Sequence, residues 1–176
     1  MKNNITTIVM KMVVYQIAFL LLHYAYDWFP NNLTKIFSGI DESIFQHMKV
    51  AFFAYILLSI LEYFLLRKKI KQPIDYLVVR LFATSFIPWT VFVFFFMAAA
   101  YYGEIHNIPV EIIYANIVLL FASFTTITVE RHFEKVSPGT AFKVVTTAMF
   151  LVSLSYYIIF SYRLPWFDVF AVPPGW

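Results

Sequence analysis

The sequence has no cysteine among its 176 residues, only four glycines, and few charged residues. The lack of cysteine excludes disulfides, thiolate metal sites and cysteine nucleophiles, and it leaves the redox compartment open. Charged residues make up 13%, about half of the ~25% typical of globular proteins. Because so few charged groups cannot coat a chain that is 61% hydrophobic, a water-soluble single domain is excluded.

Long apolar runs take the place of the missing charge. About 107 residues are apolar (61% of 176), and five membrane-crossing helices of about 20 residues each nearly account for that number. The runs are too long and too little alternating for barrel strands. We therefore expect an all-α, polytopic membrane protein, a bundle of five transmembrane helices in a single domain over 1–176. The expected spans are 12–29, 45–66, 74–102, 110–129 and 141–162, followed by a tail, 163–176.

Proline inside an apolar run predicts a bend. The third run is longer than a bilayer is thick, and Pro88 lies in its middle. Since proline removes a backbone donor and clashes with the preceding turn, we expect the third helix to bend at Pro88.

Lysine and arginine collect in two of the connections. They are Arg67, Lys68, Lys69 and Lys71 between the second and third spans, and Arg131, Lys135 and Lys143 between the fourth and fifth. These connections should be cytoplasmic, which predicts a multi-pass protein of the cell membrane with a cytoplasmic N-terminus and an extracytoplasmic C-terminus. Because the basic residues behind the net charge of +3 lie at the ends of apolar runs, the expected partner is membrane lipid and not nucleic acid.

Most of the remaining polar residues map to the outer half. They are His23, Asp27, Asp41, Glu42, Ser43, Gln46, His47, Glu104, His106 and Asp168. His23 and Asp27 are four residues apart and share a helix face, a spacing that suits a carboxylate orienting an imidazole. The pair is either an interfacial anchor of the first helix or part of a site. Asp41 is expected to cap the second span.

Imidazoles and carboxylates are the ligands that zinc uses when cysteine is absent. The sequence therefore predicts that His23, Asp27, Glu42 and His47 converge on a divalent metal such as zinc, as its ligands and as the catalytic residues. The spacing matches no helical His-Glu-x-x-His arrangement. The other interpretation is that each of these side chains is solvated or capped on its own.

The tail, 163–176, is short, rich in proline and aromatic residues, and contains one acid. It is expected to fold back over the outer mouth of the bundle as a lid that excludes water, or to lie in the headgroups as an anchor. The residues expected to line the pocket or the lid are Tyr26, Ser43, Tyr102, Trp166 and Asp168.

Two motifs and the tail resemble a family of small, uncharacterised bacterial integral membrane proteins. Residues 23–28 read His-Tyr-Ala-Tyr-Asp-Trp, residues 39–49 read Gly-Ile-Asp-Glu-Ser-Ile-Phe-Gln-His-Met-Lys, and residues 165–168 read Pro-Trp-Phe-Asp. This chain departs from the family pattern in having Asp41 for asparagine, Gln46 for glutamate, and no residue between Phe167 and Asp168. The resemblance implies a bacterial membrane protein and no assigned activity.

Charged residues at the inner side are expected to be structural. Glu62 and Arg80 should pair across helices, because each alone would be costly in lipid. Residues 130–135 are read as a mixed-charge, solvated face.

Three classes of function remain open at this point. The first is a metal-dependent membrane hydrolase or lipid-modifying enzyme whose site opens outward. The second is a non-enzymatic protein that binds or transports an ion, a lipid or an amphiphilic small molecule. The third is an accessory membrane subunit whose polar residues hold helices together.

Overall fold

The computed structural model describes residues 5–103, 105 and 107–172, without the side chains of residues 98, 99 and 102. Helices make up nearly all of the regular structure in these residues, and no strand occurs among them. The elements are α1 (Ile5–Trp28), α2 (Thr34–Phe37), α3 (Ile44–Leu66), η1 (Arg67–Lys69), α4 (Pro73–Tyr102), α5 (Ile108–Phe133), α6 (Thr140–Phe160) and η2 (Asp168–Phe170).

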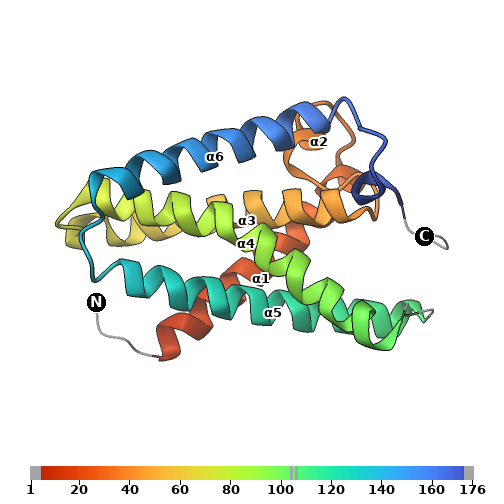
Figure 1. The fold of residues 1–176 in the computed structure, drawn as a ribbon, viewed down its shortest axis with the longest axis horizontal. Coiled ribbons are helices and arrows are strands. Elements are labelled where there is room, and N and C mark those ends of the chain that lie inside the picture. Colours follow the sequence, from red (N-terminus) through yellow and green to blue (C-terminus); the bar gives the residue numbers. More distant parts are fainter. Residues whose placement is uncertain (1–4, 104, 106, 173–176) are drawn as a thin grey trace.

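Five of these helices are long and apolar enough to cross a membrane, as the sequence predicts: α1, α3, α4, α5 and α6. The all-α fold with a five-helix bundle is thereby confirmed, and it is compatible with an integral membrane protein. We call the end that carries the α3–α4 and α5–α6 connections the lysine end. We call the opposite end, with α2, the start of α3 and the tail, the histidine end (Figure 1).

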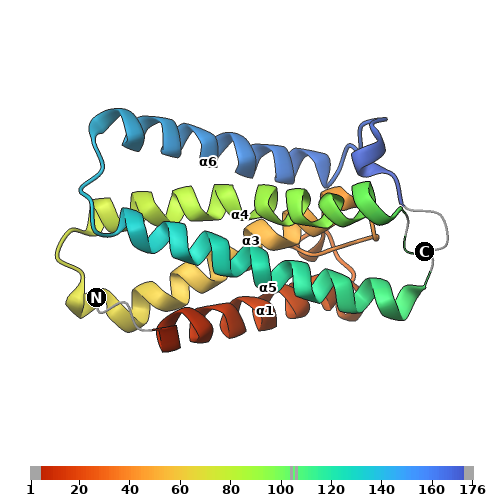
Figure 2. The same ribbon diagram turned by 60° about the horizontal axis from the view of Figure 1, so that its bottom comes forward.

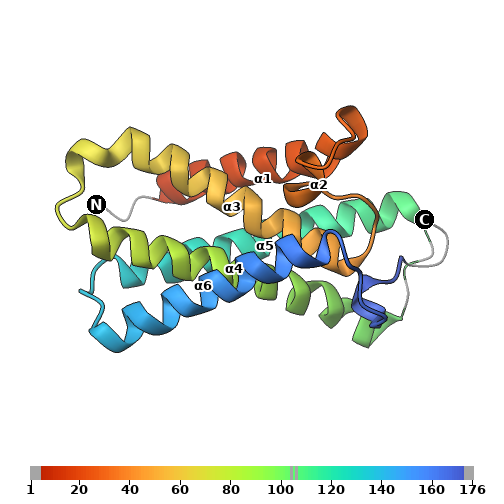
Figure 3. The same ribbon diagram turned by 90° about the horizontal axis from the view of Figure 1, so that it is seen from above.

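Helix α4 lies at the centre of the packing. It contacts α3, α5 and α6, whereas α1 packs against α3 and α5. Helices α1 and α6 therefore lie on opposite sides of the bundle (Figures 2 and 3). The core between α1, α3, α4 and α5 is apolar and closely packed, with the fully buried Tyr15, Tyr55, Ile87 and Ile127 at its centre.

Pro88 lies inside α4, which continues without interruption from Pro73 to Tyr102. Figure 1 shows α4 changing direction along its length. Because proline inside a helix removes a hydrogen bond and kinks the axis, the expected bend is present, and it turns the second half of α4 toward α5.

Two helices extend past their expected bounds. Helix α1 begins at Ile5 and not at residue 12, and α5 continues to Phe133 and not to residue 129. Both extensions include charged side chains that are buried, Lys11 in α1 and Glu130 in α5. The helices are longer than the apolar runs because they continue through these charged residues, whose charges are paired inside the bundle.

A network of charged side chains fills the lysine half of the bundle. Lys11 donates to Glu62 (2.8 Å) and to Glu130. Arg80 donates through Nε to Glu62 (2.9 Å) and through Nη2 to Glu134 (2.5 Å). The predicted Glu62–Arg80 pair is therefore confirmed, within a larger network that joins α1, α3, α4 and α5.

Residues 130–135 are not a wholly solvated face, and that prediction was wrong for two of them. Glu130 is fully buried and accepts a further hydrogen bond from the hydroxyl of Tyr55 (2.7 Å). Arg131 is 4% exposed. The reason is that these residues form the last turns of α5, which packs against α1 and α4 at this depth.

The tail folds back onto the histidine end through η2. The ring of Phe170 lies 4.7 Å from that of Phe45 at the start of α3 and also contacts Tyr156 and Phe160 of α6. Beside this aromatic cluster, the buried amine of Lys49 donates to the backbone oxygen of Lys35 (2.9 Å) and to the Ser161 hydroxyl (3.1 Å). These contacts fix the tail and α2 against α3 and α6.

Candidate metal centre at the histidine end

The site is built where α1 ends and α3 begins. His23 lies one turn before the end of α1, where its ring stacks on Phe19 one turn earlier (interplanar angle 13°). The loop after α2 passes close to this ring. A Cβ atom at Gly39 would lie 3.3 Å from the backbone oxygen of His23 and 3.4 Å from its Nδ1. Glycine at position 39 therefore lets the loop pack directly on the histidine.

Glu42 and His47 come from the segment that starts α3. The N-cap of α3 is Ser43, not Asp41, so the predicted capping role of Asp41 was wrong. Asp41 instead accepts a hydrogen bond from the backbone N–H of Ser43 through its side chain (2.9 Å). This turn places Glu42 just outside the helix and His47 on its first turn, with both side chains facing His23.

Three side chains meet at this point. The Glu42 carboxylate lies 3.4 Å from Nε2 of His23 through Oε1 and 3.3 Å from Nε2 of His47 through Oε2. One ligand atom from each of the three residues can be chosen so that all lie within 4.8 Å of one another. All three side chains are partly buried, so the cluster is neither in bulk water nor sealed from it.

The tautomer of His47 follows from its hydrogen bond. Nδ1 lies 2.9 Å from the backbone oxygen of Ser43. Because a carbonyl oxygen only accepts, Nδ1 carries the proton and the Nε2 of a neutral imidazole presents its lone pair to Glu42. Two acceptors then face each other, and the contact is favourable only if a proton or a cation lies between them. Such a carbonyl contact is also how proteins orient a metal-binding histidine.

The electrostatics of Glu42 correspond to the case in which a proton lies between each imidazole and the carboxylate. Hydrogen bonds from His23 first and from His47 second then hold the pKa of Glu42 well below its usual range, although burial opposes the shift. Glu42 is therefore ionised at neutral pH, as a metal-ligating carboxylate must be.

The spacing is close to that of a zinc site. Two ligand atoms at about 2.0–2.1 Å from a tetrahedral Zn²⁺ are about 3.4 Å apart. The nitrogen–oxygen distances of 3.4 and 3.3 Å involve different oxygens of Glu42, and one ligand atom from each residue lies within 4.8 Å of the others, so the side chains have to draw slightly closer to bind one ion. Two histidines and one glutamate with the fourth position open form a ligand set found in catalytic zinc sites. The three residues therefore fit a bound zinc ion.

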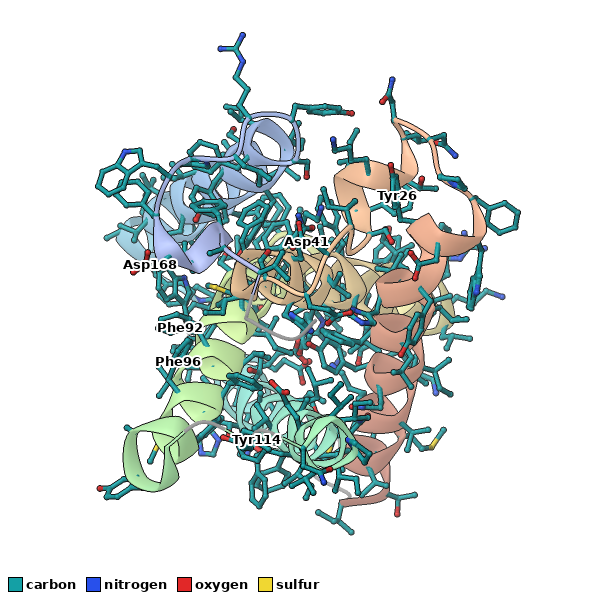
Figure 4. All side chains as sticks on the ribbon, turned by 90° about the vertical axis from the view of Figure 1, so that its right-hand side faces the viewer. Tyr26, Asp41, Phe92, Phe96, Tyr114 and Asp168 are labelled. Carbon is teal, nitrogen blue, oxygen red and sulfur yellow. The ribbon has the colours of Figure 1, made fainter. Side chains whose placement is uncertain are left out.

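The cluster forms the polar wall of an apolar cavity of about 150 Å³ between α1, α3, α4 and α5. Its other walls include Phe19, Val91, Phe95 and Leu119. Figure 4 looks at the histidine end and shows Phe92 and Phe96, also in the wall, on the α4 side, with Tyr114 on the α5 side.

Hydrogen bonds between helices hold this cavity in shape. The Tyr114 hydroxyl donates to the backbone oxygens of Phe94 (2.7 Å) and Phe95 (2.8 Å), which ties α5 to α4. The Gln16 amide donates to the Asn116 side chain (2.8 Å), which ties α1 to α5. The site thus lies on rigid elements and not on loops alone.

Of the four predicted ligands, the structure brings together His23, Glu42 and His47, but not Asp27. The Asp27 side chain is exposed near the end of α1, and its carboxylate is outside the cluster. The four-residue spacing places Asp27 on the His23 side of the helix, but one turn farther out, where the loop packs on His23 and not on Asp27.

The predicted pocket-lining residues lie elsewhere. Tyr26 and Asp168 are on different sides of the histidine end, with Asp41 between them (Figure 4). Ser43 is fully buried and contacts His47 only through its backbone. Trp166 is 87% exposed, and no described tail residue is part of the cavity wall. The Tyr102 side chain, Glu104 and His106 lie outside the described residues.

Two polar residues of the wall were missed by the sequence interpretation. They are Glu111 and Asn116, on the first turns of α5. A signal for Glu111 was available, since it is an acid at the outer end of an apolar run, like Asp27. Asn116 carried no such signal, because an amide inside a span is common as a link between helices.

Comparison of the chain with family models, curated proteins and solved structures gives no match. The family resemblance drawn from the sequence motifs therefore stays a prediction, and function has to be argued from the site.

Proposed function

We propose that the protein is a membrane-embedded, divalent-metal-dependent hydrolase, with zinc as the metal and a slender amphiphile as the substrate. His23, Glu42 and His47 are the ligands in this proposal, and the apolar cavity beside them receives the hydrocarbon part of the substrate. The site opens toward the extracytoplasmic side if the lysine end is cytoplasmic, as the distribution of basic residues predicts.

One observation carries the proposal, namely the convergence of two imidazoles and a carboxylate at the polar wall of an otherwise apolar cavity. The orientation of His47 supports it, because the Nδ1 contact with Ser43 leaves Nε2 free to bind a cation. A purely structural ion pair needs no cavity beside it.

A zinc ion with three protein ligands lowers the pKa of a bound water to about 7 and polarises a carbonyl group. We assign the carboxylate of Glu111, which lies in the same cavity wall, as the general base that accepts a proton from the attacking water. The water oxygen adds to the carbonyl carbon, the bond from that carbon to the leaving oxygen breaks, and Glu111 returns the proton to the leaving oxygen. Ester and water thereby give a carboxylic acid and an alcohol.

The cavity limits the substrate. A dry cavity of about 150 Å³ holds a ligand of roughly the size of benzene, and the volume here is also about 150 Å³. This is enough for the end or a short segment of one acyl chain but not for two chains. We therefore expect single-chain esters to be better substrates than two-chain lipids.

The test combines metal content with hydrolysis. The purified protein in lipid nanodiscs is stripped with a chelator, reloaded with zinc, and assayed against a chain-length series of p-nitrophenyl esters. We expect hydrolysis that depends on zinc and rises with chain length until the cavity is filled. His23→Ala, Glu42→Gln and His47→Ala should each lose bound zinc and activity together.

His132→Ala is the matched control, since His132 is exposed at the lysine end. It should keep both zinc and activity. Asp27→Asn should also retain zinc, because Asp27 is outside the cluster. Zinc binding without hydrolysis would show that the protein binds metal but is not a hydrolase of these esters. Absence of saturable zinc binding would refute the proposal as a whole.

A further inference from the structure

A second pocket, of about 410 Å³, lies at the lysine end. One side is formed by η1 and the start of α4, and the other by the end of α5 and the connection to α6. Three lysines are in its wall, Lys69 and Lys71 from the first side and Lys135 from the second. Its volume is within the range of about 300–1,000 Å³ that is usual for ligand pockets.

The acids of this wall are already neutralised by cations that are not part of it. Asp75 accepts from the amine of Lys143 (2.5 Å) and from the hydroxyl of Ser137 (2.6 Å). Glu134 accepts from Arg80 (2.5 Å), a member of the buried network. Neither Lys143 nor Arg80 lines the pocket.

The three lysines have no such compensation. Within the described part of the chain, no carboxylate lies at ion-pair distance from Lys69, Lys71 or Lys135. The pocket also lies beside the first turn of α4, a helix of 30 residues whose positive dipole end favours an anion. The pocket therefore carries an excess of positive charge.

Apart from Gln72, Tyr76 and Ser137, the remaining wall is apolar, and it lies where the long helices end. Leu66, Val79 and Phe133 belong to α3, α4 and α5, and Ile70 and Val136 follow the spans directly. A free phosphate ion would leave this apolar part of the wall uncovered. A lipid would cover it with its glycerol and upper chains.

We propose that this pocket binds the phosphate of an anionic phospholipid, with Lys69, Lys71 and Lys135 around the headgroup and the apolar wall against the glycerol region. The phosphate is held from two sides, by the α3–α4 and α5–α6 connections, so the bound lipid bridges them. Basic pockets between transmembrane helices commonly bind such headgroups. This site is independent of the metal centre at the other end.

The test uses two variants that remove the same charge from the same connection. Lys69→Gln/Lys71→Gln removes two lysines of the wall, whereas Arg67→Gln/Lys68→Gln removes two neighbouring cations that do not line the pocket. Each protein is transferred to micelles containing equal amounts of phosphatidylglycerol and phosphatidylcholine, and the bound lipid is counted by native mass spectrometry. Lys135→Gln tests the opposite wall, and size-exclusion profiles verify folding.

We expect the natural protein to retain phosphatidylglycerol selectively. The pocket double variant should retain about 25-fold less, and Lys135→Gln about fivefold less, since each headgroup-facing lysine contributes about 1 kcal/mol, or about fivefold. The Arg67→Gln/Lys68→Gln control should lose no more than about twofold, because those cations act only through screened attraction. Equal losses in the two double variants would overturn the proposal by showing a diffuse basic surface.

A competition arm separates the two sources of phosphate. Inorganic phosphate and glycerol 3-phosphate are titrated against the retained phosphatidylglycerol. The proposal expects neither to displace the lipid at concentrations comparable to it. Displacement by inorganic phosphate at such concentrations would overturn the lipid assignment in favour of a small-anion site.

Discussion

At the lysine end, five charged side chains form a network in which each lies within ion-pair distance of an opposite charge. They are the buried Lys11, Glu62, Arg80 and Glu130, and the partly buried Glu134. At the histidine end, one carboxylate faces two imidazoles, the three groups are only partly buried, and an apolar cavity adjoins them.

The difference separates two uses of ionisable groups in a bundle. In the lysine-end network each of the three carboxylates pairs with Lys11, Arg80 or both, so no charge of the network is left without a protein partner. In the histidine-end cluster the tautomer of His47 leaves a lone pair facing a carboxylate, so the cluster is completed only by a proton or a metal ion. Removing a charged group should therefore lower the unfolding free energy at the lysine end, whereas removing a ligand should lower metal affinity at the histidine end.

The largest expected effect is on stability at the lysine end. Glu130→Gln leaves Lys11 and Arg80 with less negative charge in a fully buried place. Breaking a buried pair on one side costs about 3–5 kcal/mol, so the unfolding free energy should fall by that order while zinc affinity is unchanged. The measurement is denaturant-driven unfolding in mixed micelles, together with a zinc titration.

The double variant Lys11→Met/Glu130→Gln sharpens this test. If the loss comes from uncompensated charge, the double variant should be more stable than Glu130→Gln alone, because the amine that lost one of its two carboxylate partners is also gone. If the double variant instead lost the sum of the unfolding free energies lost by Lys11→Met and Glu130→Gln alone, the two groups would not act as a network.

The next effect concerns the tail. Phe170→Ala removes a ring that is 7% exposed and packed on Phe45, and a buried Phe→Ala change costs about 3–5 kcal/mol. The tail should become sensitive to proteolysis, and zinc affinity should stay as it was, since no described tail residue lines the cavity. Trp166→Ala is the control. Loss of zinc affinity in Phe170→Ala would instead support the predicted role of the tail as a lid over the site.

A smaller effect is predicted for Gly39→Ala. The new Cβ would lie 3.3 Å from the backbone oxygen of His23 and 3.4 Å from its Nδ1, so the loop or the backbone at His23 must give by a few tenths of an ångström and displace the imidazole with it. Changes in what positions a metal ligand typically lower affinity about 10–100-fold, and we expect the low end of this range with nearly unchanged stability. Gly139→Ala, with no atom within 4 Å of the added Cβ, should leave zinc affinity alone.

The smallest effect is in the acid pH range. The lowered pKa of Glu42 stabilises the metal-free fold fully above the ordinary pKa of 4.5, and this contribution is lost as the pH falls toward the lower folded-state pKa. Stability of the natural protein relative to Glu42→Gln should therefore decrease below pH 4.5. A constant difference between the two proteins, followed by circular dichroism through that range, would contradict the assigned state of Glu42.

The apolar runs predicted the helices well, because length and hydropathy alone decide what can cross a membrane. Hydropathy did not show how far the helices continue beyond the apolar runs. Lys11 and Glu130 lie inside helices because they meet each other across the bundle, and no single run contains that information. Glu62–Arg80 was predictable, since two lone charges at equal depth have to pair.

The site was predictable only in part. Residue type and outer position nominated His23, Glu42 and His47, but they nominated Asp27 equally, and only the path of the loop over His23 separates them. Glu111 and the cavity come from α4 and α5 packing against α1 and α3. That packing depends on the bend at Pro88 and on contacts far apart in the sequence.

The central claim is that the histidine-end cluster binds a metal ion. The most direct measurement is X-ray absorption at the zinc edge on metal-stripped protein reloaded with one equivalent of zinc. The account predicts a shell of only nitrogen and oxygen ligands at about 2.0–2.1 Å with outer-shell scattering from two imidazoles, and loss of this bound-zinc signal in His23→Ala. A spectrum of fully hydrated zinc, or one unchanged in His23→Ala and His47→Ala, would contradict it.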